Sequence, residues 1–418
     1  MLNPSQIGWI KKYVSLSKSG QIDLDLGATQ KDWKVEDLQR LLASSGIIFG
    51  IYGNFIFLRQ GSFEQWTNHE KMKVLYFESL LLVYIFHRGK DYNFEKFFEE
   101  VQQFFGQSGS EKLDQTWSIN RFLGIPRNLE KTIAERTRIP LSFDNEIWVN
   151  YLQNSLCYID ITLFDLFLQK KNNFEFRTLR SKKIQLTLSV IIHALQSDGY
   201  IDEAEKKMFK LFMASADLTS QEKLEFEMLL SAGVKLQSLQ SASKMSELFR
   251  KYLFELAIFS VLSDTDFSSK ERKMLVQLSN MLNISKSGVA SSFEIVERFT
   301  FDHEEIVTNL KSKSNYERIF LRLSAKWSKL FLRNKDKLVT EIRESSELVA
   351  LVKKSMSQTL SDEEKVRVKT QFFDIVKSVP SLAIFMLPGG AFILPFVLKV
   401  LPDLLPSAFR DNEIKDNE

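Results

Sequence analysis

Two short acidic segments contain the residue types in this chain that are best suited to bind a ligand. They match each other at an offset of 66 residues, as 197–208 and 263–274, and share the pattern Ser-Asp-x-x-apolar-(Asp/Ser)-x-x-Glu-basic-Lys-Met. Carboxylate oxygens are hard ligands that suit Ca²⁺, Mg²⁺ or Mn²⁺. The candidate metal ligands are therefore the acidic side chains of both segments, namely Asp198, Asp202, Glu205, Asp264, Asp266 and Glu271.

Helix capping explains most of the same pattern without a metal. The pairs Asp202/Glu205 and Ser268/Glu271 each precede an apolar helical stretch and have the three-residue spacing of a capping box. Capping does not explain Asp198 or its counterpart in the second segment, because a helix dipole disfavours an acid at the end of the preceding helix. Both interpretations remain open: capping alone, or capping beside a bound divalent cation.

The elements around these segments are predicted to be helices. Apolar periodicity predicts helices before the segments, at 184–195 and 252–262, and after them, at 204–214 and 270–282. Upstream, the same periodicity predicts helices at 34–45, 67–88, 93–106 and 145–170. A short β-hairpin is predicted across 46–58, where β-prone residues flank Gly53-Asn54. The 16 glycines and 8 prolines are few for 418 residues, which favours a mostly α protein.

The composition excludes several classes of protein. The 56 basic and 53 acidic residues give a net charge of only +3, so direct DNA binding is not expected. The single cysteine, Cys157, lies in an apolar stretch and is predicted to be a buried structural thiol in a reducing compartment. The sequence contains no Gly-rich phosphate loop, zinc-ligand spacing or nucleophile elbow. We therefore predict a protein that is not an enzyme.

The acidic repeat resembles the TerB-like (tellurite-resistance) domain over about 180–290. That family is an all-helical module of two similar halves, with an Asp-Gly-x-Ile-Asp-x-x-Glu turn in the first and a degenerate Asp-x-x-apolar-Ser-x-x-Glu turn in the second. The matching turns here are 198–205 and 264–271. The resemblance implies clustered acids able to hold a divalent cation. In the second turn, Thr265 and Ser268 stand where the family often has a glycine and an acid.

The C-terminal region contains a segment without charge. Residues 379–398 include no charged side chain across 20 positions, and five of the eight prolines fall between Pro380 and Pro406. A helix of that length can cross a bilayer core of about 30 Å. The Pro-Gly-Gly at 388–390 breaks it, so a kinked span, a re-entrant hairpin and a buried soluble hairpin all remain open. Basic residues before the segment favour a cytoplasmic N-terminal flank.

This segment is similar to the membrane segment of the Letm family over roughly 345–410. The family comprises leucine-zipper/EF-hand-containing transmembrane proteins of mitochondria, implicated in cation/proton exchange, volume homeostasis and ribosome binding. The family has an acid where this chain has Ala391. Its ribosome-binding domain follows the membrane segment, so this chain, which ends at Glu418, is expected to lack that domain. The residues that carry the resemblance are Pro380, Pro388, Gly389, Gly390, Pro395, Lys399, Pro402 and Pro406.

Together these features predict a multi-domain, mostly α protein. The predicted parts are a helical N-terminal region (1–170), a TerB-like domain (171–295), a helical connector (296–376), a Letm-like membrane segment (377–410) and an acidic tail (411–418). The N-terminus lacks the pattern of a signal peptide, so the bulk is expected on the cytoplasmic side of an inner membrane. The layout resembles a bacterial group that is Letm-related and biofilm-associated.

The resemblances imply a non-enzymatic membrane-associated protein. Its expected role lies in envelope stress, biofilm or cation homeostasis, with a divalent cation sensed through Asp198, Asp202 and Glu205. Three alternatives stay open: cation/proton transport by a homo-oligomer, ribosome binding, and a soluble scaffold with a buried C-terminal hairpin.

Overall fold

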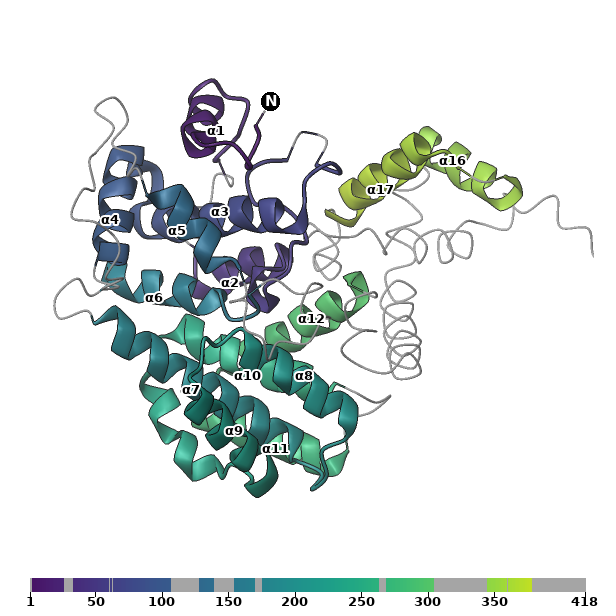
Figure 1. Cartoon of the computed structure of the whole chain (residues 1–418). Coiled ribbons are helices and arrows are strands. Elements are labelled where there is room, and N and C mark those ends of the chain that lie inside the picture. Colours follow the sequence, from purple (N-terminus) through teal and green to yellow (C-terminus); the bar gives the residue numbers. More distant parts are fainter. Residues whose placement is uncertain are drawn as a thin grey trace, which may run out of the picture.

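The computed structural model of the 418-residue chain describes residues 2–25, 33–59, 61, 63–106, 128–138, 154–169, 175–262, 268–303, 344–358 and 360–377. These residues form α-helices and short 3₁₀ helices joined by turns, and no strand occurs in these ranges. The prediction of a mostly α protein is therefore confirmed. Figure 1 shows the helices in chain order.

The first group of helices surrounds α3. Its members are α1 (Trp9–Lys18), α2 (Val35–Ser44), α3 (Asn68–Arg88), α4 (Phe94–Gly106), α5 (Leu129–Arg136) and α6 (Tyr158–Gln169), with the 3₁₀ helices η2 (Ile47–Phe49) and η3 (Gly89–Asp91). Helix α3 packs on α2, α5 and α6, and it is buried on all sides from Val74 to Ile85. The helices predicted at 67–88 and 93–106 are confirmed. The helix predicted at 145–170 is shorter than expected, because residues 155–157 form a turn and α6 begins at Tyr158.

The prediction of a β-hairpin across 46–58 was wrong. Residues Ile47–Phe49 form η2, and the chain from Ile51 to Leu58 has no strand partner. The reason is a buried carboxylate on α3. Glu78 accepts hydrogen bonds from the backbone amides of Ile56 (2.6 Å), Phe57 (3.2 Å) and Leu58 (2.9 Å). Buried amides need an acceptor, and here a side chain supplies what a neighbouring strand would otherwise supply.

The second group of helices contains the internal repeat. Its members are α7 (Phe176–Leu195), α8 (Glu203–Ala214), α9 (Ser220–Ala232), the 3₁₀ helix η5 (Leu236–Lys244), α10 (Glu247–Val261), α11 (Ser269–Met281) and α12 (Lys286–Asp302). Helices α7 and α10 pack on each other at the centre, α8 packs on α7, and α11 packs on α10. The helices predicted on both sides of the acidic segments are confirmed.

The repeat is structural as well as sequential, and its offset is again 66 residues. The N-caps of α8 and α11 are residues 202 and 268, and those of α9 and α12 are Thr219 and Ser285. Between these helices, Asp217 and Asn283 both adopt a left-handed conformation with φ of 53°. Asp and Asn tolerate that conformation better than other non-glycine residues. The two halves therefore share caps and turns at equivalent positions.

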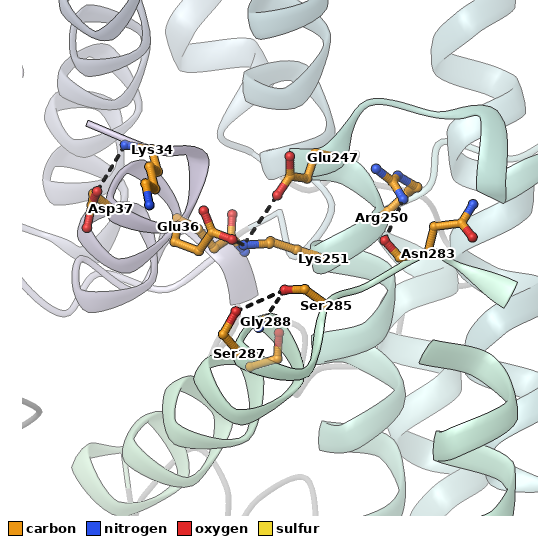
Figure 2. Close-up of polar contacts among 12 residues, drawn as sticks. Lys34, Glu36, Asp37, Glu247, Arg250, Lys251, Asn283, Ser285, Ser287 and Gly288 are labelled. Carbon is orange, nitrogen blue, oxygen red and sulfur yellow. Dashed lines mark hydrogen bonds and ion pairs between the residues drawn. The ribbon is translucent and has the colours of Figure 1, made fainter. Parts of the chain in front are cut away.

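A buried polar junction joins the N-terminal helices to the repeat. Helix α2 packs on α10 and α12. Figure 2 shows Lys251 of α10 between Glu36 of α2 and Glu247, at Nζ–Oε1 distances of 3.1 and 3.6 Å. Nearby, Ser285 Oγ accepts from the amide of Gly288 at the start of α12 (3.0 Å). Because the Lys251 side chain is buried, its ion pair with Glu36 fixes the position of α2 more firmly than a surface pair would, whereas the pair with Glu247 lies within α10.

Helices α16 (Ser346–Ser357) and α17 (Asp362–Lys377) form a hairpin that precedes the uncharged C-terminal segment. Leu348 and Val352 of α16 are buried with Val368 and Phe372 of α17. A capping box starts α17: Ser361 and Glu364 form reciprocal hydrogen bonds of 3.0 and 3.3 Å between the amide of each residue and the side chain of the other. The hairpin thus has its own small apolar interface.

Candidate functional site

The first acidic turn is held by its own hydrogen bonds. The carboxylate of Asp202 accepts from the amide of Glu205 (2.8 Å), and the carboxylate of Glu205 accepts from the amide of Asp202 (2.8 Å). Asp198, which lies after the end of α7, accepts from the amide of Tyr200 (3.0 Å), and Gly199 between them has φ of 96°. Each of the three carboxylates therefore accepts a hydrogen bond from a local amide, and the predicted capping box is confirmed.

The second acidic turn repeats the cap. Ser268 Oγ accepts from the amide of Glu271 (3.2 Å), and Glu271 accepts from the amide of Ser268 (2.6 Å). Asp264 and Asp266 lie outside the described residues. Among the residues that the structure describes, no three His, Cys, Asp or Glu side chains converge as a metal site would require. Metal binding at either turn stays a prediction.

The two turns lie next to each other across the repeat. Lys270 on the first turn of α11 donates from Nζ to the backbone carbonyl of Asp198 (3.2 Å). This contact borders a hollow of about 480 Å³ formed by the last turn of α7, the connection from α9 to η5, and α11. We call it the basic hollow. Its main polar side chains are His193, Gln196, Lys235, Lys270, Lys273 and Gln277.

Two buried titratable groups lie in the core, away from both acidic turns. Cys157 is fully buried, as predicted, and burial raises the pKa of its thiol far above the ordinary range. Lys183 is also buried, with Nζ 2.8 Å from Thr162 Oγ1 and 4.1 Å from the ring centre of Phe249. Burial lowers the pKa of Lys183 to about 7. Both groups lie in the core, where no substrate can reach them.

The predicted membrane residues, from Pro380 to Pro406, lie outside the described residues. In the part of the chain that the structure describes, no helix is both long and apolar enough to span a bilayer. The long apolar helix α3 is used for packing, because its middle residues face neighbouring helices on all sides. The structure therefore leaves the membrane prediction for 379–398 untested.

The comparisons with known proteins concern the C-terminal part of the chain. Residues 360–418 match the LETM1-like, RBD family model. This part of the chain is therefore Letm-related. The match begins just before α17 and includes the uncharged segment, so the expectation that this chain lacks such a domain was wrong.

A curated relative supports the same assignment. A segment of 78 residues is 36% identical to the LETM1 domain-containing protein YLH47, mitochondrial, of Saccharomyces cerevisiae. The match covers 19% of this chain and spans 17% of the length of that protein. No solved structure matches the chain significantly. The likeness to this relative therefore covers about a fifth of the chain, and the family model covers residues 360–418.

Reasoning from the sequence found the acidic turns but not the basic hollow beside them. The spacing of Lys270 and Lys273 places both side chains on one face of a predicted helix, which is a weak signal. Lys235 belongs to a different element, and only the packing of the repeat brings it to the same hollow.

Proposed function

We propose that this chain is a non-enzymatic, membrane-associated protein of the Letm-related type whose C-terminal part binds the ribosome. The observation that carries the proposal is the match of residues 360–418 to the LETM1-like, RBD (ribosome-binding domain) family. That stretch includes residues 379–398, the only run of 20 residues in the sequence that has no charged side chain and contains several prolines. One segment would then supply both the membrane contact and the ribosome contact.

One stretch of α17 has the charge that a ribosome contact needs. The helix has as many acidic as basic residues, but its acids lie in the first turn (362–364) and at Asp374. Lys365, Arg367 and Lys369 form a basic stretch between them, and Lys377 ends the helix. Contacts between basic side chains and phosphates dominate the affinity of proteins for nucleic acids and weaken as salt rises. The basic residues of α17 are therefore the expected contacts to ribosomal RNA.

Co-sedimentation with ribosomes tests this contact. The full chain is compared with the charge-reversed variant Lys365→Glu/Lys369→Glu at low and high salt. The matched control Lys11→Glu/Lys12→Glu makes the same charge change at two exposed positions of α1. We expect binding to fall about tenfold or more in the first variant, because two phosphate contacts are lost, and to persist in the control. Equal binding by both variants would contradict a ribosome contact on α17.

Fractionation of cells that contain the full chain tests the membrane contact. We expect the chain in the membrane fraction, released by detergent and retained in high salt, because an apolar segment is not displaced by screening charges. Release by salt alone would contradict insertion of residues 379–398.

The match to the family model does not address the more specific predictions. These are a bacterial inner membrane with the bulk of the chain in the cytoplasm, a role in envelope stress, biofilm or cation homeostasis, transport by a homo-oligomer, and cation sensing at the first acidic turn. Each of them stays a prediction.

A further inference from the structure

The charge of the basic hollow is one-sided. Lys235, Lys270 and Lys273 all line it, and no carboxylate side chain is present among the described residues of its lining. Three ammonium groups around one hollow repel one another, and the repulsion is not offset within the lining. An arrangement of this kind is stabilised when an anion enters.

The walls of the hollow are fixed by side-chain hydrogen bonds. Gln196, after the end of α7, donates from Nε2 to the carbonyl of Leu230 (2.8 Å) and accepts at Oε1 from the amide of Val234 (3.2 Å). His193 Nδ1 lies 2.7 Å from the carbonyl of Val234. His193 in the last turn of α7 and Gln196 just after it thus clamp the connection from α9 to η5, which contains Lys235. A site with fixed walls loses little conformational freedom when a ligand binds.

The clamp also sets the protonation pattern of His193. A carbonyl oxygen can only accept, so Nδ1 must carry the hydrogen. Nε2 is buried and has no hydrogen-bond partner among the described residues. A buried polar atom without a partner is uncommon in a folded protein and requires an explanation.

The internal repeat shows that the fold does not need these polar residues. At an offset of 66 residues, His193 corresponds to Phe259 and Gln196 to Leu262, and both of these counterparts are buried in the core. On the other wall, Lys270 corresponds to Ala204. Gln277 likewise corresponds to Leu211, which is buried. Lys273 is the exception, because its counterpart is Lys207. The same supersecondary unit therefore exists with apolar residues at the other four of these positions, so the fold itself does not require polar side chains there.

We propose that the basic hollow binds a small phosphate-bearing ligand with two or more negative charges. Phosphate oxygens accept hydrogen bonds from ammonium groups, and the lysines provide such donors from two elements. The volume of about 480 Å³ falls in the range of small-molecule sites, roughly 300–1,000 Å³, and would admit a pyrophosphate or a nucleotide. This site is separate from the C-terminal segment and goes beyond the proposed function.

The test uses the full chain and a matched pair of variants. The hollow variant is Lys235→Gln/Lys273→Gln, which removes two charges and leaves Lys270 with its contact to Asp198. The control variant is Lys244→Gln/Lys286→Gln, which removes two charges at exposed positions outside the hollow. Pyrophosphate and ATP without added metal are titrated calorimetrically into each protein. Vesicles of phosphatidylcholine with phosphatidic acid are compared in a second arm to distinguish a free phosphate from a lipid headgroup.

We expect saturable binding of one ligand per chain, weakened about tenfold or more in the hollow variant and unchanged in the control, because charge-assisted hydrogen bonds are lost. Vesicle binding that depends on the hollow lysines in the same way would identify a lipid headgroup as the source. Thermal unfolding checks the fold: the unliganded hollow variant should melt at or above the wild-type temperature, because repulsion is removed. Absence of binding by any probe, or equal weakening in both variants, would overturn the proposal.

Discussion

Glu78 is a buried carboxylate whose effect on the stability of the folded chain can be tested by changing the pH. It is fully buried in α3 and accepts four hydrogen bonds, from the hydroxyl of Tyr13 (2.7 Å) and from the amides of residues 56–58. Burial disfavours the charged form and the hydrogen bonds favour it. Burial is the larger effect, and the pKa of Glu78 is raised from 4.5 to about 7.

The direction of the pH dependence follows from this raised pKa. Between pH 4.5 and 7 the folded chain holds a proton on Glu78 that the unfolded chain has lost. The contribution of protonated Glu78 to the stability of the folded chain is therefore fully present below pH 4.5 and is lost as the pH rises through 7. A difference between 4.5 and about 7 corresponds to roughly 2–3 kcal/mol of unfolding free energy lost between pH 5 and pH 8.

The substitution Glu78→Gln removes this titration and nearly preserves the shape. The amide oxygen can accept from Ile56 and Phe57, and the NH₂ group can donate to the Tyr13 hydroxyl. The amide of Leu58 then faces an NH₂ group and loses its acceptor, which costs about 1–3 kcal/mol. We expect the variant to be about 2 kcal/mol less stable than wild type at pH 5 and about equal to it at pH 8.

The assay is urea unfolding of the full chain at several pH values, followed by circular dichroism and by tryptophan fluorescence. The ring centre of Trp9 lies 5.7 Å from that of Phe77, the residue before Glu78, and Trp9 contributes to the fluorescence signal. The control Glu64→Gln makes the same chemical change at an exposed position, and its difference from wild type should not depend on pH. A gap between Glu78→Gln and wild type that widens as the pH rises would refute the reasoning, because it would show that the hydrogen bonds outweigh burial.

Three further substitutions, one of them with a matched control, test individual contacts. Glu130→Ala removes the acceptor for the amides of Gly8 and Ile10 at the start of α1 (2.8 and 2.9 Å), and urea unfolding should show a loss of about 1–2 kcal/mol. Gly50→Ala would drive a methyl group into the backbone at 154–155 at a φ of 68°, so a loss above about 4 kcal/mol is expected, whereas Gly20→Ala, in open space, should cost about 1 kcal/mol. Asp202→Ala removes the cap of α8 and should cost about 1 kcal/mol. If Ca²⁺ or Mn²⁺ raises the melting temperature of wild type but not of that last variant, capping alone is insufficient.

The local features of this chain were the ones that its sequence could predict. The capping boxes at 202–205, 268–271 and 361–364 depend on residues three positions apart, so the pattern alone identifies them. Helix α3 was predictable because a long apolar run with a Thr67–Glu70 start signal leaves few alternatives. In each of these cases the deciding contacts lie within one turn of helix.

The features that sequence reasoning missed depend on distant residues. The stretch 51–58 reads as β-prone, but its amides bind a carboxylate about twenty residues later, on a helix whose apolar pattern gives no sign of that role. The basic hollow could not be predicted for the same reason, because Lys235 and Lys273 come to line one hollow only when the repeat folds. Periodicity reports which face of an element is apolar, and it does not report which polar group on another element will meet it.

The two proposed sites lie in different parts of the chain. The Letm-related stretch begins at residue 360, whereas the basic hollow lies between α7, α9 and α11. A ligand in the hollow can influence the C-terminal segment only if it binds two conformations of the chain with different affinities, and any such coupling must be reciprocal. The ordered clamp from His193 and Gln196 to the α9–η5 connection gives the hollow one well-defined arrangement. The simplest relation is therefore independence, in which pyrophosphate leaves ribosome co-sedimentation unchanged and the hollow and α17 variants each lose only their own ligand.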